Sequence, residues 1–274
     1  MSPFTTLQKI LPQHGLSRLA RSAANSTTPW FKNLLIESFT RSYNVDLSEA
    51  TGQKPEDYPS FNAFFTRALQ TGTRPIDADL AVVVSPTDGT ISQCGAIESG
   101  TLLQAKGNHY NIRDLAGVLG DGFDRGSFAT VYLAPNNYHR VHLPIAGRLT
   151  HTLTQPGALF SVNNHTVEAI KDLFVRNERL VCRFETILGP VLVILVGAMI
   201  VASIETVWGS PTSPYQHVEL NEHHLDFEKG AELGRFLLGS TVICCFPQHT
   251  ITLDPNLAPA TPVKMGQSIG VIKI

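Results

Sequence analysis

The spacing of apolar residues changes along the chain, from a helical period near the N-terminus to short strand-like runs further on. In residues 4–44, apolar side chains recur every three or four positions, which is typical of helices that bury one face. From residue 80 onward the apolar runs are short and are separated by Gly and Pro. They read "LAVVVSP", "GTISQCG", "FATVYLAP", "RLVCRFET", "VLVILVG", "MIVASIETVW", "STVICCF" and "SIGVIKI". The pattern predicts an α+β protein, with a mainly β body and a helical, amphipathic N-terminal arm.

The best-defined helix of the arm is predicted for "PWFKNLLIESFTRSY", which begins with Pro29, a residue favoured in the first turn of a helix. Most of its large apolar side chains are expected on one face. They are Trp30, Phe31, Leu34, Leu35 and Phe39. Such a helix either packs on the body or lies in a lipid interface, and the pattern alone leaves both interpretations open. A polar connector follows at 51–60, and Ser60 is predicted to cap a short helix after it.

Charge is distributed unevenly between the arm and the rest of the chain. Residues 1–44 carry five basic side chains and one acidic one, a net charge of +4, and the remainder carries −6. The near balance of the whole chain, 21 basic against 23 acidic residues, excludes nucleic acid as the expected partner. A basic arm on an acidic body instead favours an anionic surface such as a membrane.

The longest apolar run, "VLVILVGAMIVA" at 191–202, predicts a buried strand. It has 12 residues, whereas a membrane-spanning helix needs about 20. Its β-branched residues and the Gly-Pro pair before it favour a strand. No secretory signal is predicted either, since Lys9 and Pro12 interrupt the only early apolar cluster.

Two polar clusters interrupt the apolar strands and hold candidate catalytic residues. The first, "SPTDGTIS", contains Asp88, although Asp-Gly after a strand is ordinarily a turn. The second, "YLAPNNYHRVHLP", contains His139 and His142. No Glu completes an H-E-x-x-H motif, and side chains three apart on a strand face opposite ways, so no metal site is predicted. Structural histidines remain the alternative.

The third candidate is the pair Gly239-Ser240 inside the apolar stretch "RFLLGSTVICCF". Asp88, His142 and Ser240 are the residue types of a relay in which Asp orients His and His removes the serine proton. The serine does not lie in a G-x-S-x-G motif. It follows a glycine, whose carbonyl has no side chain to shield it. This arrangement indicates a serine that attacks its own backbone, which would make the pair a self-processing site.

Taken together, these motifs resemble the phosphatidylserine decarboxylase proenzymes of the bacterial type. The resemblance runs from about residue 30 to the C-terminus and rests on "FNAFFTR", "TRPID", "SPTDGTIS", "LQAKG", "YHRVHLP", "ASIETVW" and "LLGST" in this order. The chain departs from the family at "TRAL", where T-R-P-L is frequent, at Ala158, where an acidic residue is common, and along 209–228.

The resemblance implies a chain that cleaves itself between Gly239 and Ser240. The products would be a β-chain (1–239) and an α-chain (240–274) that stay together as a heterodimer. This heterodimer could assemble further into a homo-oligomer. Ser240 would become a pyruvoyl group, with neither a metal nor pyridoxal phosphate. His142, oriented by Asp88, would remove the Ser240 proton.

The resemblance also implies the substrate, the domains and the location of the protein in the cell. Phosphatidylserine in an anionic membrane would be converted to phosphatidylethanolamine and CO2, with His139 and Ser161 lining the substrate site. Residues 1–59 would form a helical membrane-associating region and 60–274 the decarboxylase domain. The protein would be peripheral, on the cytoplasmic face of the cell membrane.

Other functions fit the same residues. A serine hydrolase would use the triad on external esters, and a non-catalytic membrane-bound β module would keep Asp and His as structural groups. Within the pyruvoyl enzymes, the substrate could be a related phospholipid or a free amino acid. An intact-mass measurement distinguishes a self-cleaved pyruvoyl enzyme from the serine hydrolase and from the non-catalytic module.

Overall fold

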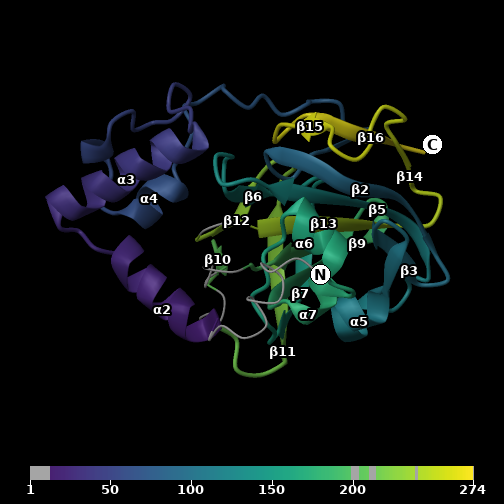
Figure 1. Ribbon diagram of the computed structural model, residues 1–274. Helices are drawn as coiled ribbons and strands as arrows, with labels where there is room; N and C mark the ends of the chain where they lie inside the picture. Colours follow the sequence, from purple (N-terminus) through teal and green to yellow (C-terminus); the bar gives the residue numbers. More distant parts are fainter. Residues whose placement is uncertain (1–12, 199–203, 210–213, 238–239, 274) are drawn as a thin grey trace.

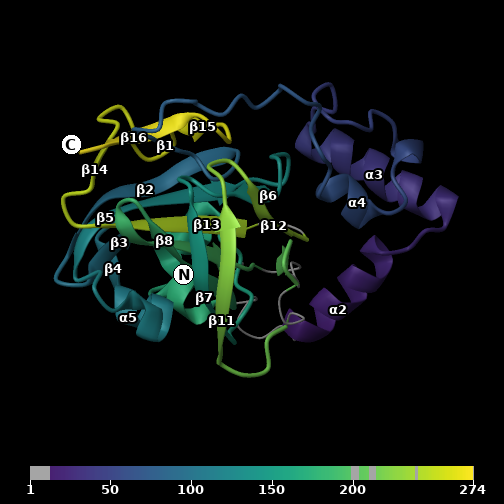
Figure 2. The same ribbon diagram turned by 180° about the vertical axis from the view of Figure 1, so that it is seen from behind.

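A computed structural model describes residues 13–198, 204–209, 214–237 and 240–273 of the chain. It has a β body and, to one side of it, a group of helices formed by the N-terminal quarter of the chain (Figure 1). The reverse view shows the same separation, with α2, α3 and α4 beside the body rather than across its sheet (Figure 2). This is the α+β fold that the sequence predicts, and the prediction is confirmed.

The body is built around one large antiparallel sheet of ten strands within the described ranges. Its strands, in spatial order, are β11 (Glu219–Phe227), β7 (Gly147–Gln155), β8 (Arg179–Thr186), β9 (Gly189–Val196), β13 (Ser240–Pro247), β5 (Arg125–Leu133), β2 (Gly89–Glu98), β3 (Thr101–Ala105) and β4 (Asn108–Asn111), with β15 (Pro262–Val263) pairing with β2. The central strand β13 pairs with β5 on one side and with β9 on the other.

Two smaller antiparallel sheets complete the body. One contains β1 (Val82–Val84), β16 (Ser268–Ile272) and β14 (Ile251–Leu253), and the other contains β10 (Ile204–Thr206), β12 (Glu232–Phe236) and β6 (Arg140–His142). The stretch "RFLLGSTVICCF" is therefore not one strand. It is divided between β12 in a small sheet and β13 in the large one, and Ser240 is the first residue of β13.

Alternating side chains of the central strands fill two separate cores. Ile243 and Cys245 of β13 point into the first core, whereas Val242, Cys244 and Phe246 point into the second. Short helices contribute to the first core. They are α5 (Ile112–Ala116), η2 (Gly117–Gly120), α6 (Asn164–Ala169) and α7 (Leu173–Arg176). Since both faces are covered, a central strand reads as continuously apolar. The buried strand predicted at 191–202 is confirmed as far as Val196, and 199–203 lie outside the described residues.

The helical arm has a small core of its own. It comprises α2 (Gln13–Ala24), α3 (Pro29–Tyr43), η1 (Pro55–Asp57) and α4 (Phe61–Phe65), and its buried side chains include Ile36, Phe61, Phe64 and Phe65. Ser60 caps α4 by accepting a hydrogen bond from the Ala63 N–H at 3.2 Å, as predicted. Because α4 belongs to this core, the predicted boundary after residue 59 cuts through one packed unit.

The apolar residues of α3 do not share one face as expected. Leu35 and Phe39 pack against the core of the arm, whereas Trp30 and Leu34 are 71% and 59% exposed. The members of each pair are four residues apart and the two pairs are offset by five residues, so they form two stripes about 140° apart on the helix. Lys32 is buried, and its ammonium group donates to the Pro55 carbonyl at 2.9 Å.

None of the helices in the described ranges combines the length and the apolar character that a membrane-spanning helix needs.

Candidate active site

Ser240 is the first residue of β13, where the chain enters the large sheet. It lies opposite Leu133 of β5, and its side chain is fully buried. Its Oγ has no hydrogen-bond partner within the part of the chain that the structure describes. A buried hydroxyl without a partner costs about 1–3 kcal/mol, so an unpaired group in a native structure calls for an explanation. The Ser240 hydroxyl is therefore not engaged by any other described group and is available for reaction.

Asp88 lies between β1 and β2 and is held by a buried guanidinium group. Arg74 donates from Nε to Oδ1 at 2.9 Å and from Nη2 to Oδ2 at 2.6 Å, and the Met265 N–H donates to Oδ1 at 2.9 Å. The next residue, Gly89, begins β2, and a Cβ there would lie 2.3 Å from the carbonyl oxygen of Tyr132. Only glycine allows this close approach, which fixes the position of the Asp88 loop against β5.

His142, the last residue of β6, is buried and has a partner on each ring nitrogen. Nδ1 lies 2.9 Å from the Gly230 carbonyl oxygen and must donate to it, so Nε2 accepts from the Tyr138 hydroxyl at 3.0 Å. Burial lowers the pKa of His142, and the hydrogen bond to Gly230 offsets this only in part. The imidazole is therefore neutral at pH 7. Within the described residues, no hydrogen bond joins His142 to Asp88 or to Ser240.

His139 is completely buried at the other end of the same motif. Its Nδ1 donates to the Asn137 carbonyl at 2.9 Å, and its ring lies 4.0 Å from the ring of Phe65, centroid to centroid. Its Nε2 has no hydrogen-bond partner in the described ranges. A neutral ring with a free lone pair can accept a proton from, or hydrogen-bond to, a group that enters this site.

Backbone hydrogen bonds bring these segments together. The His142 N–H donates to the Pro86 carbonyl at 2.7 Å, which joins "YHRVHLP" to the loop of Asp88. The Phe236 N–H donates to the His139 carbonyl at 3.0 Å, which joins the same motif to the segment that leads to Ser240. Residues distant in sequence thus form one site around the start of β13.

Ser161 lies between β7 and α6 and is half-buried. Its Oγ accepts from the Asn163 N–H at 3.5 Å. Nearby, Ala158 forms an isolated bridge with Asn177, which ties this segment to the start of β8. The predicted place of Ser161 in the substrate site stays a prediction.

The structure places three further residues at this site that the sequence pattern does not single out: Arg74, Arg67 and Tyr138. Arg74 and Arg67 lie in "TRPID" and "FNAFFTR", motifs that carry the family resemblance, but nothing in the pattern indicates what a lone arginine contacts. Tyr138 precedes His139 directly, and its contact with His142 follows only from the turn of the chain between them.

Acidic conditions should destabilise the protein through His139. Burial lowers the pKa of this imidazole to about 3, whereas a histidine in the unfolded chain titrates near 6.5. Between these values the unfolded state binds the proton and the folded state does not, so stability falls as the pH falls from about 6.5 towards 3. We expect the free energy of unfolding, measured in urea, to lose about 2–3 kcal/mol from this group between pH 6.5 and 4.5. His139→Gln should show a correspondingly shallower pH dependence, and equal slopes would contradict the assignment.

The described residues contain no group of three or more His, Cys, Asp or Glu side chains that could hold a metal ion. Fold and site together define an α+β protein with a buried, unpaired serine at a strand start and two buried neutral histidines in the motif that pairs with the strand before it. The family model described as "Phosphatidylserine decarboxylase" matches residues 61–271, and a second model, described as "PSD", matches residues 3–44. The chain belongs to the phosphatidylserine decarboxylase family.

Similar proteins cover nearly the whole chain. The phosphatidylserine decarboxylase proenzyme of Azotobacter vinelandii is 48% identical over 275 residues, which is 96% of each chain. That of Alcanivorax borkumensis is 48% identical over 97% of this chain and 95% of its own, and that of Pseudomonas aeruginosa (strain LESB58) is 48% identical over 98% and 97%. The predicted family is confirmed.

Proposed function

We propose that this chain is a phosphatidylserine decarboxylase, which converts phosphatidylserine to phosphatidylethanolamine and CO2 after cleaving itself at Gly239-Ser240. The observation that carries the proposal is the buried, unpaired Oγ of Ser240 in a member of this family. The relatives are named proenzymes, which supports a step of chain processing.

The cleavage step follows from the chemistry of the two residues. His142 removes the hydroxyl proton of Ser240, and Oγ attacks the carbonyl carbon of Gly239, so that an ester replaces the peptide bond and the Ser240 amine is released. Elimination then releases the Gly239 carboxylate and leaves a double bond at residue 240. Water converts this residue to a ketone and ammonia, which gives a pyruvoyl group at the start of the α-chain.

The environment of Ser240 fits such a group, since it is enclosed and its side-chain oxygen has no competing partner in the described ranges. A pyruvoyl ketone supplies an electron sink for decarboxylation, the role that other cofactors have elsewhere. The chain's own residues position the reaction. His139 presents its Nε2 as a polar contact for the substrate, and Phe65 packs on the other atoms of its ring. The roles of His139 and Ser161 in substrate binding are part of this proposal.

The sheet explains how the two chains would stay together after cleavage. The α-chain would begin with β13, which pairs along its length with β5 of the β-chain and from Thr241 to Cys245 with β9. Its later strands β15 and β16 pair with β2 and β1. The proposed heterodimer therefore requires no rearrangement of the sheet.

A direct assay tests the function. Purified protein should release CO2 from phosphatidylserine in detergent micelles and form an equal amount of phosphatidylethanolamine, both followed by mass spectrometry. Free serine should not be decarboxylated. A processed protein that leaves phosphatidylserine unchanged would overturn the proposal.

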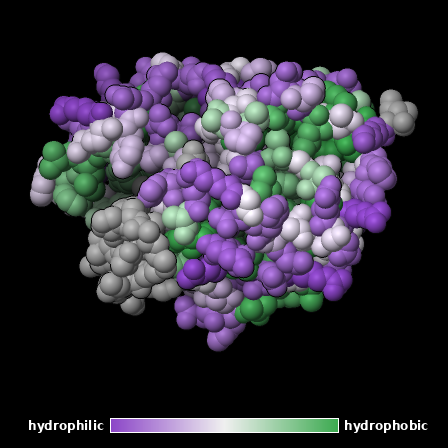
Figure 3. All heavy atoms as spheres, turned by 45° about the vertical axis from the view of Figure 1, so that its right-hand side comes forward, coloured by the Kyte–Doolittle hydropathy of each residue, from purple (hydrophilic) through white to green (hydrophobic). Residues whose placement is uncertain are grey.

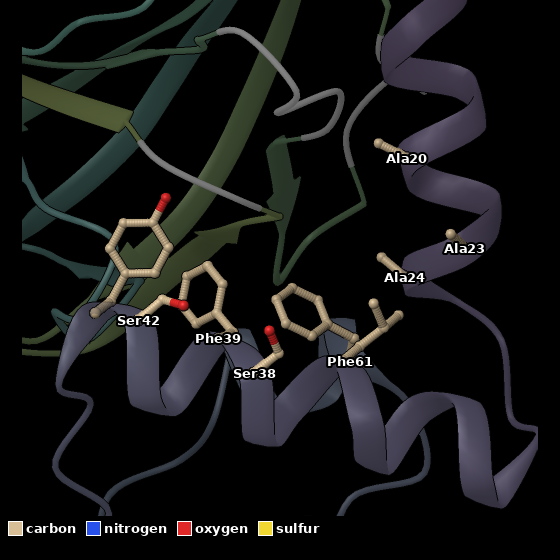
Figure 4. A pocket seen from close by; sticks show the side chains of 9 residues that line it. Ala20, Ala23, Ala24, Ser38, Phe39, Ser42 and Phe61 are labelled. Carbon is tan, nitrogen blue, oxygen red and sulfur yellow. The ribbon is translucent and has the colours of Figure 1, made fainter.

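The arm is proposed to hold the enzyme on the anionic, cytoplasmic face of the cell membrane. Trp30 and Leu34 of α3 are exposed, and Figure 3 shows apolar surface at the left end of the molecule, where α3 begins. Between α2 and α3 lies an apolar cleft of about 380 Å³. Figure 4 shows Ala20 and Ala24 of α2 on one side of it and Phe39 on the other. Exposed aromatic and aliphatic side chains beside an apolar cleft support contact with lipid.

Removing the two exposed side chains should weaken membrane binding. Trp30→Ser with Leu34→Ser is expected to reduce affinity for phosphatidylglycerol vesicles about tenfold or more, since each buried large side chain contributes about 1.5–3 kcal/mol. High salt should weaken binding by the unmodified protein as well, because the arm is basic.

A matched control is Leu80→Ser with Ile187→Ser, since these side chains are 80% and 78% exposed on the body. This control should bind vesicles as the unmodified protein does. Co-sedimentation measures all three proteins, and unchanged binding by the folded arm variant would mean that α3 serves only to pack the arm.

A further inference from the structure

Arg67 has a buried guanidinium group with which no carboxylate is directly paired among the described residues. It follows α4, is only 4% exposed, and forms no ion pair with a carboxylate among the described residues. Its Nη2 donates to the carbonyl oxygens of Asn136 and Asn137, at 2.9 and 3.4 Å. The Nε–H and both Nη1–H groups have no partner in the part of the chain described. The Phe64 ring lies 5.6 Å from the guanidinium carbon and compensates the charge only in part. Burial of a charge that no carboxylate pairs with is costly, so this arrangement points to a missing anion.

Two other buried guanidinium groups in the described ranges, those of Arg179 and Arg74, do have partners. Arg179, which is 3% exposed, donates from Nε to the Leu115 carbonyl at 2.6 Å and from Nη2 to the Asp114 carbonyl at 2.7 Å, and its Nη1 contacts two further carbonyls. Arg74 is paired with the carboxylates of Asp88 and Glu49. Structural arginines are thus satisfied in this fold, and Arg67 differs from them.

Arg67 lies next to the candidate active site. The Asn137 carbonyl that accepts from Arg67 also accepts from His139 Nδ1, at 2.9 Å, so the two side chains share one acceptor. Burial lowers the pKa of Arg67, and the charge of Arg67 in turn contributes to the lowered pKa of His139. The unpaired Nε2 of His139 and the unpaired nitrogens of Arg67 therefore belong to neighbouring buried side chains.

We propose that Arg67 binds the phosphodiester of the substrate headgroup and so positions the serine moiety at residue 240. The inference rests on the proposed function, since it takes phosphatidylserine as the substrate. That substrate carries two anionic groups. The carboxylate loses its charge as CO2 leaves, so an arginine paired with it would stabilise the ground state more than the transition state. The phosphodiester keeps its charge throughout, and a guanidinium can hold it without slowing the reaction.

The first experiment measures binding without catalysis. Glycerophosphoethanolamine carries the phosphodiester and no carboxylate, and L-serine carries the carboxylate and no phosphate. Calorimetry on the purified full chain should show binding of glycerophosphoethanolamine that Arg67→Gln weakens at least tenfold, the range of a charge-assisted hydrogen bond. Arg67→Lys, which keeps the charge, should retain part of the affinity. Arg113→Gln, a change at an exposed arginine, should have no effect.

The second experiment separates binding from chemistry in the processed enzyme. With a short-chain soluble phosphatidylserine, Arg67→Gln should raise KM about tenfold or more and leave kcat, per processed chain, within about twofold. A loss of kcat at unchanged KM, serine binding that depends on Arg67, or equal phosphodiester binding by both proteins would overturn the proposal. If the unmodified enzyme released no CO2, the proposed function would fail, while the calorimetric comparison would still decide whether Arg67 binds the phosphodiester.

Discussion

Replacing Ser240 with alanine is expected to leave the chain uncut at 274 residues and to abolish decarboxylation. The unmodified protein should separate on a denaturing gel into two chains, the smaller being residues 240–274 with a blocked N-terminus. The reason is that the proposed function makes the hydroxyl of Ser240 both the nucleophile of cleavage and the precursor of the pyruvoyl group. Intact-mass spectrometry measures the result directly, and an active Ser240→Ala protein, or an active unmodified protein that remains in one piece, would refute self-processing.

The neighbouring residue provides a matched control. Thr241 is also fully buried, and its Oγ1 likewise has no partner in the described residues. Thr241→Val keeps the shape of the side chain and removes only the hydroxyl. We expect this variant to be processed normally, because its side chain points to the opposite face of β13 from Ser240. Loss of processing in both variants would indicate that the sheet, rather than the serine, had been disturbed.

Much of the fold is encoded in local patterns. Short apolar runs separated by Gly and Pro predict the β body, and the run at 191–196 is apolar throughout because its two faces fill different cores. The pairing of strands is not local. Nothing in "RFLLGSTVICCF" indicates that its two halves join different sheets, since that depends on the partners β6 and β5, a hundred residues earlier.

For the candidate site, too, the sequence indicates which residue types are present but not what they contact. The sequence singles out Asp88, His142 and Ser240 as the types of a relay, and the structure brings their segments together. It also gives each of the first two a partner that the pattern does not indicate, Arg74 for Asp88 and Tyr138 for His142. Such contacts join motifs far apart in the sequence, so residue types alone cannot predict them.

The two histidines should separate cleavage from decarboxylation. His142→Ala is expected to accumulate the intact chain, because removal of a general base slows proton transfer about 10²–10⁴-fold. In the structure, Nδ1 of His142 is fixed on the Gly230 carbonyl and Nε2 on the Tyr138 hydroxyl. Under the proposed function, Nε2 would act as the base after exchanging the Tyr138 hydroxyl for that of Ser240. The fraction of intact chain after a fixed time measures this effect.

His139→Ala should instead be cleaved and then decarboxylate poorly. Its Nδ1 is also fixed, on the Asn137 carbonyl, but its Nε2 has no partner in the described ranges and lies in a fully enclosed position. A nitrogen in this state is suited to contact a substrate that enters later, and its loss should lower the rate per processed chain about a hundredfold. His109→Ala, a change at an exposed histidine whose Nδ1 also contacts a carbonyl, should affect neither step. If His139→Ala blocked cleavage while His142→Ala was cut normally, the two roles would be reversed, and the nitrogen without a partner would be the base that activates Ser240.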